Sequence, residues 1–127
     1  MIPYSTVSHD IRVTVRPVYL DGQSDMLGRR FVFGYHVYIG NEGVDDVQLL
    51  RRHWIITDAT GRIREVEGEG VIGKQPVIAP GTAHEYNSYS VIETFTGFME
   101  GSYVMERSRG ERFRVTIPRF NLQAAAN

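Results

Sequence analysis

The stretch FVFGYHVYI, residues 31–39, decides the fold class of this chain. Large apolar side chains stand at every second position from Phe31 to Ile39, and the positions between them hold Val32, Gly34, His36 and Tyr38. Because successive side chains of a β-strand point to opposite faces, this period of two predicts a strand with one face in a core and one in water. The same period recurs at residues 11–16 and 112–117, after which Pro118 is expected to end the strand.

Turn signals separate the apolar runs at short intervals. Residues 58–61 (DATG) lie between runs at 54–56 and 63–66, and Gly61 suits the positive φ of a tight hairpin. Further turns are expected at residues 41–43, 80–81 and 109–110. No window of helical length shows a 3.6-residue period free of glycine or proline. The pattern therefore predicts seven to eight short antiparallel strands in an all-β sandwich, with a small barrel as the alternative.

The chain has 127 residues, enough for one domain with its own core. We assign the domain to residues 1–127, with its core over about residues 10–122 and with flexible tails at 1–8 and 123–127. Trp54, the only tryptophan, lies in the third predicted strand and is expected in the core.

Composition excludes several classes of protein. The 14 basic and 15 acidic side chains give a net charge of −1, which argues against nucleic-acid binding through bulk electrostatics. Cysteine is absent, so disulfides, thiolate catalysis and cysteine-bound zinc are excluded. No apolar run is long enough to insert in a membrane, and the first residues do not resemble a signal peptide, so a cytoplasmic protein is expected.

Residues 68–74 (GEGVIGK) match two phosphate-loop patterns, G-x-G-x-x-G and G-x-x-x-x-G-K. Both patterns need a helix to begin directly afterwards, and the prolines and glycine of residues 75–81 (QPVIAPG) forbid one. Two interpretations remain. The glycines either allow a bulged crossover between strands, or they form a nest of backbone amides that binds an anion, with Lys74 adding charge. The candidate residues for anion binding are Gly68, Gly70, Gly73 and Lys74.

Arg52 is a further candidate, because in a strand it shares a face with Trp54. If Trp54 is buried, Arg52 points inward and needs an acidic or carbonyl partner. It either forms a structural buried ion pair or helps to bind an anion beside the glycine loop.

The sequence offers little for catalysis or metal binding. The four histidines show no metal-binding spacing, and no G-x-S-x-G elbow occurs. Glu65, Glu67 and Glu69 alternate along one strand, where acids form a paired-carboxylate site or protect an exposed edge. We therefore assign no catalytic residue, no metal site and no cofactor.

Aromatic side chains crowd residues 86–103. In a loop they would be anchors for protein contacts, and they could equally cap the open end of the sandwich. The protein-contact candidates are Tyr86, Tyr89, Phe95 and Phe98.

Long ordered motifs resemble the bacterial ApaG (CorD) family. The matching segments are residues 48–58 (QLLRRHWIITD), 61–62, 66–76 (VEGEGVIGKQP), 80–81 and Tyr86, with 15–20 and 23–24 upstream and 99–103 and 113–120 downstream. The resemblance covers about residues 10–122. Members commonly carry a Ser-Gly-Cys-Pro-Leu run where this chain has residues 88–92 (SYSVI), so any function of that segment is in question here.

The resemblance implies an immunoglobulin/fibronectin type III-like β-sandwich. It also implies an association with cobalt resistance and magnesium efflux, and nucleotide or pyrophosphate binding through Gly68, Gly70 and Gly73. Related domains in F-box and polymerase-delta-interacting proteins imply a protein-interaction module.

Together these observations predict a non-catalytic binding module. The first hypothesis is an interaction with an unidentified partner protein through the sheet edges or the aromatic segment, where a homodimer through sheet edges is also considered. The second is binding of a small phosphate-containing molecule, and the third, least favoured, is a phosphohydrolase.

Overall fold

The computed structural model describes residues 3–124. This part of the chain forms nine strands and one turn of 3-10 helix, connected by short turns and loops. The elements are β1 (Tyr4–Ser8), β2 (Ile11–Tyr19), η1 (Asp21–Gln23), β3 (Phe31–Asn41), β4 (Val47–Asp58), β5 (Ile63–Glu69), β6 (Val77–Ile78), β7 (Ala83–Ile92), β8 (Thr96–Arg107) and β9 (Arg112–Gln123).

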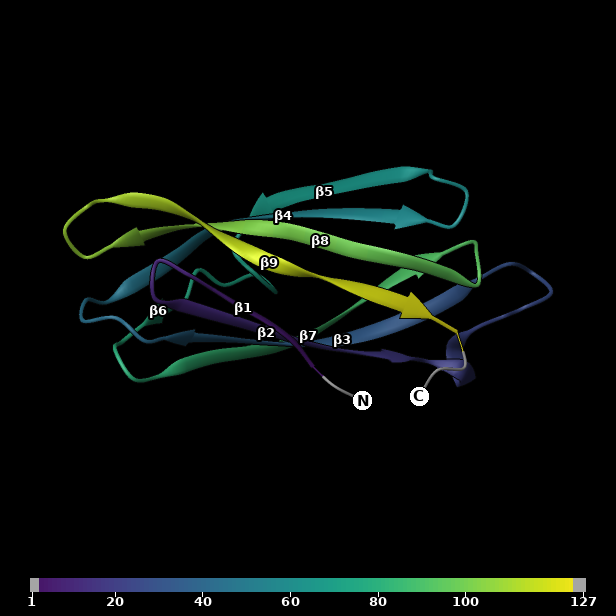
Figure 1. Ribbon diagram of the computed structural model, residues 1–127, viewed down its shortest axis with the longest axis horizontal. Coiled ribbons are helices and arrows are strands. Elements are labelled where there is room, and N and C mark those ends of the chain that lie inside the picture. Colours follow the sequence, from purple (N-terminus) through teal and green to yellow (C-terminus); the bar gives the residue numbers. More distant parts are fainter. Residues whose placement is uncertain (1–2, 125–127) are drawn as a thin grey trace.

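The strands form two antiparallel sheets that pack face to face (Figure 1). One sheet has the order β1-β2-β3-β7, and the other has the order β5-β4-β8-β9, with the short β6 pairing with β4. The predicted all-β sandwich is confirmed. The strand number exceeds the predicted seven to eight because the sequence pattern did not show β1 and the two-residue β6.

The core lies between the two sheets and follows the period of two. Phe33, Val37 and Ile39 of β3 face it and are almost completely buried. Trp54 is 4% exposed, and its ring centroid lies 5.2 Å from that of Tyr35 across the sheets. Both the strand assignment of residues 31–39 and the core position of Trp54 are therefore confirmed.

Turn chemistry also follows the sequence. Gly61 has φ +87° between β4 and β5, and Gly110 has φ +91° between β8 and β9. Pro118 does not end its strand as expected. The β8–β9 register shifts between Met99 and Gly101, so Pro118 lies at a bulge, where its missing N–H breaks no regular ladder.

Strands extend into both segments that were expected to be tails. Tyr4–Ser8 is the edge strand β1, paired with the first half of β2. At the other end, Ala124 is buried and its N–H donates a 3.0 Å hydrogen bond to the carbonyl oxygen of Phe95. The rest of both expected tails, residues 1–2 and 125–127, lies outside the described residues.

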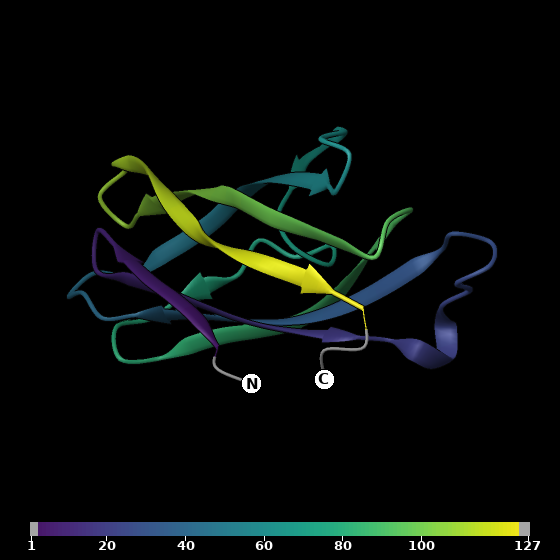
Figure 2. The same ribbon diagram turned by 45° about the vertical axis from the view of Figure 1, so that its right-hand side comes forward.

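The sandwich has one closed and one open side. On the closed side, β9 packs against β1 and β2 of the opposite sheet (Figure 2). On the other side, β5 ends one sheet and β7 ends the other, and a cleft lies between these two edge strands. We call this side, from β5 across the cleft to β7, the open flank. Within residues 3–124 no helix is long and apolar enough to cross a membrane.

Candidate functional site

A cleft of about 460 Å³ occupies the open flank. Inward-facing residues of β4 form its floor, where Trp54 and Ile56 separate it from the core. The walls come from β5 and β7, and residues 71–73 of the β5–β6 connection close one end. The volume lies within the range of ordinary ligand sites.

Arg52 enters the cleft from β4, on the same face as Trp54, as its spacing predicts. Its Nη1 donates hydrogen bonds to the carbonyl oxygens of Glu69 (3.1 Å) and Gly70 (3.0 Å). No carboxylate of residues 3–124 lies within ion-pair distance of this guanidinium. The structural ion pair considered from the sequence is therefore wrong, and carbonyl groups take its place.

Arg64 enters the same cleft from β5. Its Nη2 donates to Ser90 Oγ (3.2 Å) and to the carbonyl oxygen of Val91 (3.1 Å), so the side chain crosses the opening from one sheet to the other. In the described part of the chain, Arg64 also has no carboxylate partner.

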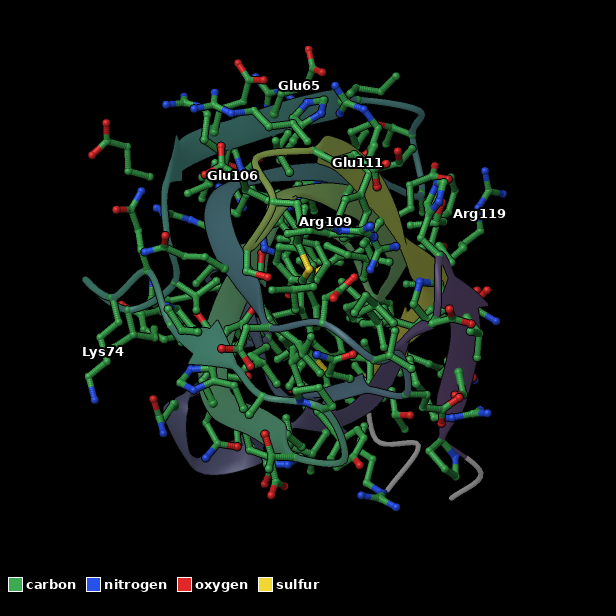
Figure 3. All side chains as sticks on the ribbon, turned by 90° about the vertical axis from the view of Figure 1, so that its left-hand side faces the viewer. Glu65, Lys74, Glu106, Arg109, Glu111 and Arg119 are labelled. Carbon is green, nitrogen blue, oxygen red and sulfur yellow. The ribbon has the colours of Figure 1, made fainter. Side chains whose placement is uncertain are left out.

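Arg64 is not among the residues predicted from the sequence, although a signal is present there. The acids of β5 stand at odd positions, whereas Arg64 and Val66 stand at even positions and share the other face. Glu65 points away from the cleft and pairs with His53 Nε2 at 2.9 Å on the outer face of the sheet (Figure 3). The alternation along β5 therefore places the acidic side chains on the outer face of the sheet and Arg64 in the cleft.

Three tyrosine hydroxyls lie beside Arg52. Burial raises the pKa of Tyr35, and its hydrogen bond with Ser88 partly opposes this rise. Burial also raises the pKa of Tyr86 and of Tyr103, whose hydroxyl groups hydrogen-bond to each other. These groups therefore stay neutral at physiological pH. Tyr35 and Tyr86 present hydroxyls, not phenolates, to the cleft.

The glycine segment is a two-residue hairpin turn. The N–H of Val71 donates to Lys74 O (2.8 Å), and the N–H of Lys74 donates to Val71 O (3.0 Å). The central residues Ile72 and Gly73 have φ +48° and +72°, the pair of positive values that a type I′ turn requires. No helix follows, as the prolines predict.

The other two glycines of the motif, Gly70 and Gly68, are required for different steric reasons. Gly70 has φ +63°, and a Cβ built there would lie 2.1 Å from the carbonyl oxygen of Lys74. At Gly68 a Cβ would lie 2.8 Å from Arg52 Nη1, so the glycine makes room for the guanidinium. The glycines thus serve the backbone, as the first interpretation held, but in a hairpin turn and not in a bulged crossover.

The same geometry leaves few amides for an anion. The N–H groups of Gly70, Val71 and Lys74 all donate to backbone carbonyls. Lys74 is exposed and points away from the molecule (Figure 3), and it does not line the cleft. Of the five anion-binding candidates, only Arg52 and Gly73 line it. Anion binding through the loop stays a prediction.

The four protein-contact candidates do not share one loop. Tyr86 and Tyr89 lie in β7, where Tyr86 is buried at the cleft and Tyr89 is 66% exposed at its rim. Phe98 lies in β8 beneath the Arg119 guanidinium, 4.2 Å from its ring centroid. Phe95 stacks on Phe31 at 6.0 Å, so it covers an end of the core, as the capping alternative predicts.

The segment of residues 87–90 is also strand. It lies within β7, whose alternate residues Tyr86, Ser90 and Ile92 are buried. Its sequence is polar because the other face of this edge strand is in water. Among residues 3–124, no three side chains of the metal-binding types cluster.

The fold and the cleft define an antiparallel β-sandwich domain of the immunoglobulin/fibronectin type III-like type, with a binding-site-sized cleft on one flank. The family model described as the ApaG domain matches residues 21–107. The chain belongs to the ApaG domain family, as the sequence motifs indicated.

Individual relatives cover nearly the whole chain. It is 55% identical over 121 residues to Protein ApaG of Rhodospirillum centenum, which covers 95% of this chain and 93% of that protein. Identity to Protein ApaG of Paramagnetospirillum magneticum is 51% over the same shares. The crystal structure of a Bordetella pertussis protein named ApaA has a TM-score of 0.90 at 42% identity, covering 93% of this chain and 96% of that one.

Proposed function

We propose that this domain is a non-catalytic binding module whose open flank receives an extended segment of a partner protein. The observation that carries the proposal is the position of the cleft between two edge strands, β5 and β7. An edge strand presents backbone N–H and C=O groups that a further strand can pair with. The open flank offers two such edges around one cleft.

Exposed apolar side chains at the cleft support this role. Val66, Ile72 and Tyr89 line it and are 39%, 61% and 66% exposed. Each comes from a different segment, so together they surround the opening. An apolar rim of this kind gains free energy when a partner covers it.

The shape of the flank supports an elongated occupant. A second hollow of about 570 Å³ adjoins the cleft and shares Ile56, Arg64 and Val91 with it. The two hollows lie next to each other along β5 and β7, with the Arg64 side chain crossing where they meet, and we call them together the trench. A trench suits an extended chain better than a compact small molecule.

The side chains in the cleft support binding over catalysis. The described residues that line it include no carboxylate, histidine or lysine. The cleft itself therefore offers no general base, and the carboxylates of Asp58 and Glu93 line only the adjoining hollow. An effect on cobalt resistance or magnesium efflux, which the resemblance implies, would then act through the partner and not through direct coordination of an ion.

Binding of a small anion is the second candidate, and one observation favours it. Arg52 and Arg64 bring two guanidinium groups without carboxylate partners into one cleft. Guanidinium groups bind phosphate or carboxylate through paired hydrogen bonds.

Photo-crosslinking in living cells tests the proposed docking site. Tyr89 is replaced by p-benzoylphenylalanine, and Val44, 89% exposed and outside the cleft lining, receives the same replacement as the control. We expect a discrete cross-linked partner from position 89 that is absent from position 44. Ile72→Asn should weaken this product without disturbing the turn, because asparagine tolerates the positive φ. Identical products from both positions would contradict the proposal.

A further inference from the structure

The cleft holds two charged side chains, Arg52 and Arg64, that pair with no carboxylate of residues 3–124, while Asp58 and Glu93 line the adjoining hollow. Six other guanidinium groups of residues 3–124 pair with carboxylates, as Arg12 does with Glu42 (2.7 Å) and Arg112 with Glu106 (2.8 Å). Arg52 and Arg64 instead donate to neutral carbonyl and hydroxyl oxygens. Those bonds hold the two groups in place without cancelling their charge.

Each arginine also retains donors for a ligand. A guanidinium has five N–H groups. Within residues 3–124, the hydrogen bonds of Arg52 use only Nη1, and those of Arg64 use only Nη2. Two guanidinium groups that are held in place therefore line the trench, and each keeps N–H groups that a ligand can accept from.

The two guanidinium groups are held well apart. Arg64 pairs in register with Ile56, four residues after Arg52 on β4. At about 3.3 Å per residue, the two backbone positions are about 13 Å apart along the strands. The Arg52 guanidinium is tied to the carbonyls at the end of β5, and the Arg64 guanidinium is tied to β7. Because the two groups are tied to different strands, a ligand that binds both at once is more easily an elongated one, whereas a compact anion would bind at either.

We infer that the open flank recognises an acidic extended peptide, with one carboxylate at Arg52 and a second at Arg64. This inference rests on the proposed function and adds the chemistry of the partner. In an extended chain, residues i and i+4 face the same side and are about 13 Å apart, which matches the spacing of the two arginines.

The middle of the trench completes the recognition pattern. Between the arginines, Trp54 and Val66 stand opposite each other on β4 and β5 and line the cleft. A residue at i+2 of the peptide faces the same side as the two acids, so it meets this apolar surface. The geometry therefore selects a segment with the pattern acid-x-apolar-x-acid.

Selection from a random heptapeptide display library tests the inference on the full chain. Wild-type protein is used for selection, and Arg64→Gln is used for counter-selection. We expect enriched peptides to carry Asp or Glu at two positions four residues apart, with an apolar residue midway. Enrichment of peptides without acids, or no enrichment, would overturn the inference.

Synthetic peptides give the quantitative test. Affinity for an enriched peptide should fall about tenfold on Arg64→Gln, and equally when the matching acid of the peptide is changed to its amide. Arg51→Gln is the matched control, because it removes the same charge from the exposed outer face of β4 and should leave affinity unchanged. Thermal unfolding of both variants checks that the fold is intact. Equal losses for Arg51→Gln and Arg64→Gln would refute a specific site.

Two further experiments distinguish the acidic-peptide inference from small-anion binding and from the proposed docking site. Sodium pyrophosphate and inorganic phosphate are titrated by NMR, and a tighter response from either than from the acidic peptides would overturn the peptide inference. The Tyr89 cross-link is repeated in the Arg64→Gln background. If the same partner is captured there with undiminished yield, the docking site stands and the acidic pattern is refuted.

Discussion

The Gly70→Ala substitution tests the role of the glycine segment most directly. Gly70 has φ +63°, a conformation that costs an alanine about 1–2 kcal/mol. The added Cβ would lie 2.1 Å from the backbone carbonyl oxygen of Lys74, and a backbone atom cannot rotate aside as a side chain does. The turn must therefore open as well.

Opening the turn has its own cost. The Lys74 carbonyl accepts the N–H of Val71 at 2.8 Å, and Val71 is 1% exposed, so its position contributes to the core. Loss of that hydrogen bond costs about 0.5–1.5 kcal/mol. Together the two effects predict a loss of about 2–3 kcal/mol in the free energy of unfolding. For a domain of this size, that corresponds to a fall of about 8–12 °C in Tm.

Denaturant unfolding followed by circular dichroism measures the change, with Gly73→Ala as the matched control. Gly73 has φ +72° but no heavy atom within 4 Å of the added Cβ, so only the conformational cost of about 1–2 kcal/mol applies. The reasoning fails if Gly70→Ala is no more destabilising than Gly73→Ala. It also fails if Gly70→Ala is stable but loses binding of pyrophosphate, since the glycine would then serve a ligand and not the backbone.

Two further predictions concern the core. Trp54→Ala should lower the free energy of unfolding by about 3–5 kcal/mol, because the side chain is 4% exposed and packs on Tyr35 and Phe120. Denaturation followed by far-UV circular dichroism measures this change. A loss below about 1 kcal/mol would contradict the prediction. Burial raises the pKa of Tyr86 and Tyr103 above the ordinary 10.0, so the unfolded chain loses these protons first as pH rises. Stability should be fully present below about pH 9.5 and fall above about pH 10, and the double variant Tyr86→Phe/Tyr103→Phe should fall less; an equal fall would refute the assignment.

Local sequence chemistry predicted most of the strands. The alternation at residues 31–39 and the glycine at position 61 act over a few residues, because pleating and turn geometry are properties of neighbouring backbone units. Prediction of strands was weaker at the edge of a sheet, where few side chains are apolar. Residues 83–92 form an edge strand whose outer face is polar, and no strand was predicted there.

The candidate site was only half predicted. The inward direction of Arg52 and its need for an acidic or carbonyl partner follow from its spacing to Trp54, and the structure supplies carbonyls. The contact between Arg64 and Ser90 on the opposite side of the cleft could not be predicted. These residues are 26 positions apart in the chain and meet only across the two sheets.

The sequence by itself determined an all-β domain of the ApaG family, a core built around Trp54, and a glycine segment that cannot begin a helix. Only the tertiary structure decided that this segment is a closed hairpin turn and that the site is the cleft beside it. The physical reason is the order of the strands. Periodicity specifies which face of a strand is buried, whereas the pairing of distant strands specifies which edges stay open and which charges meet there.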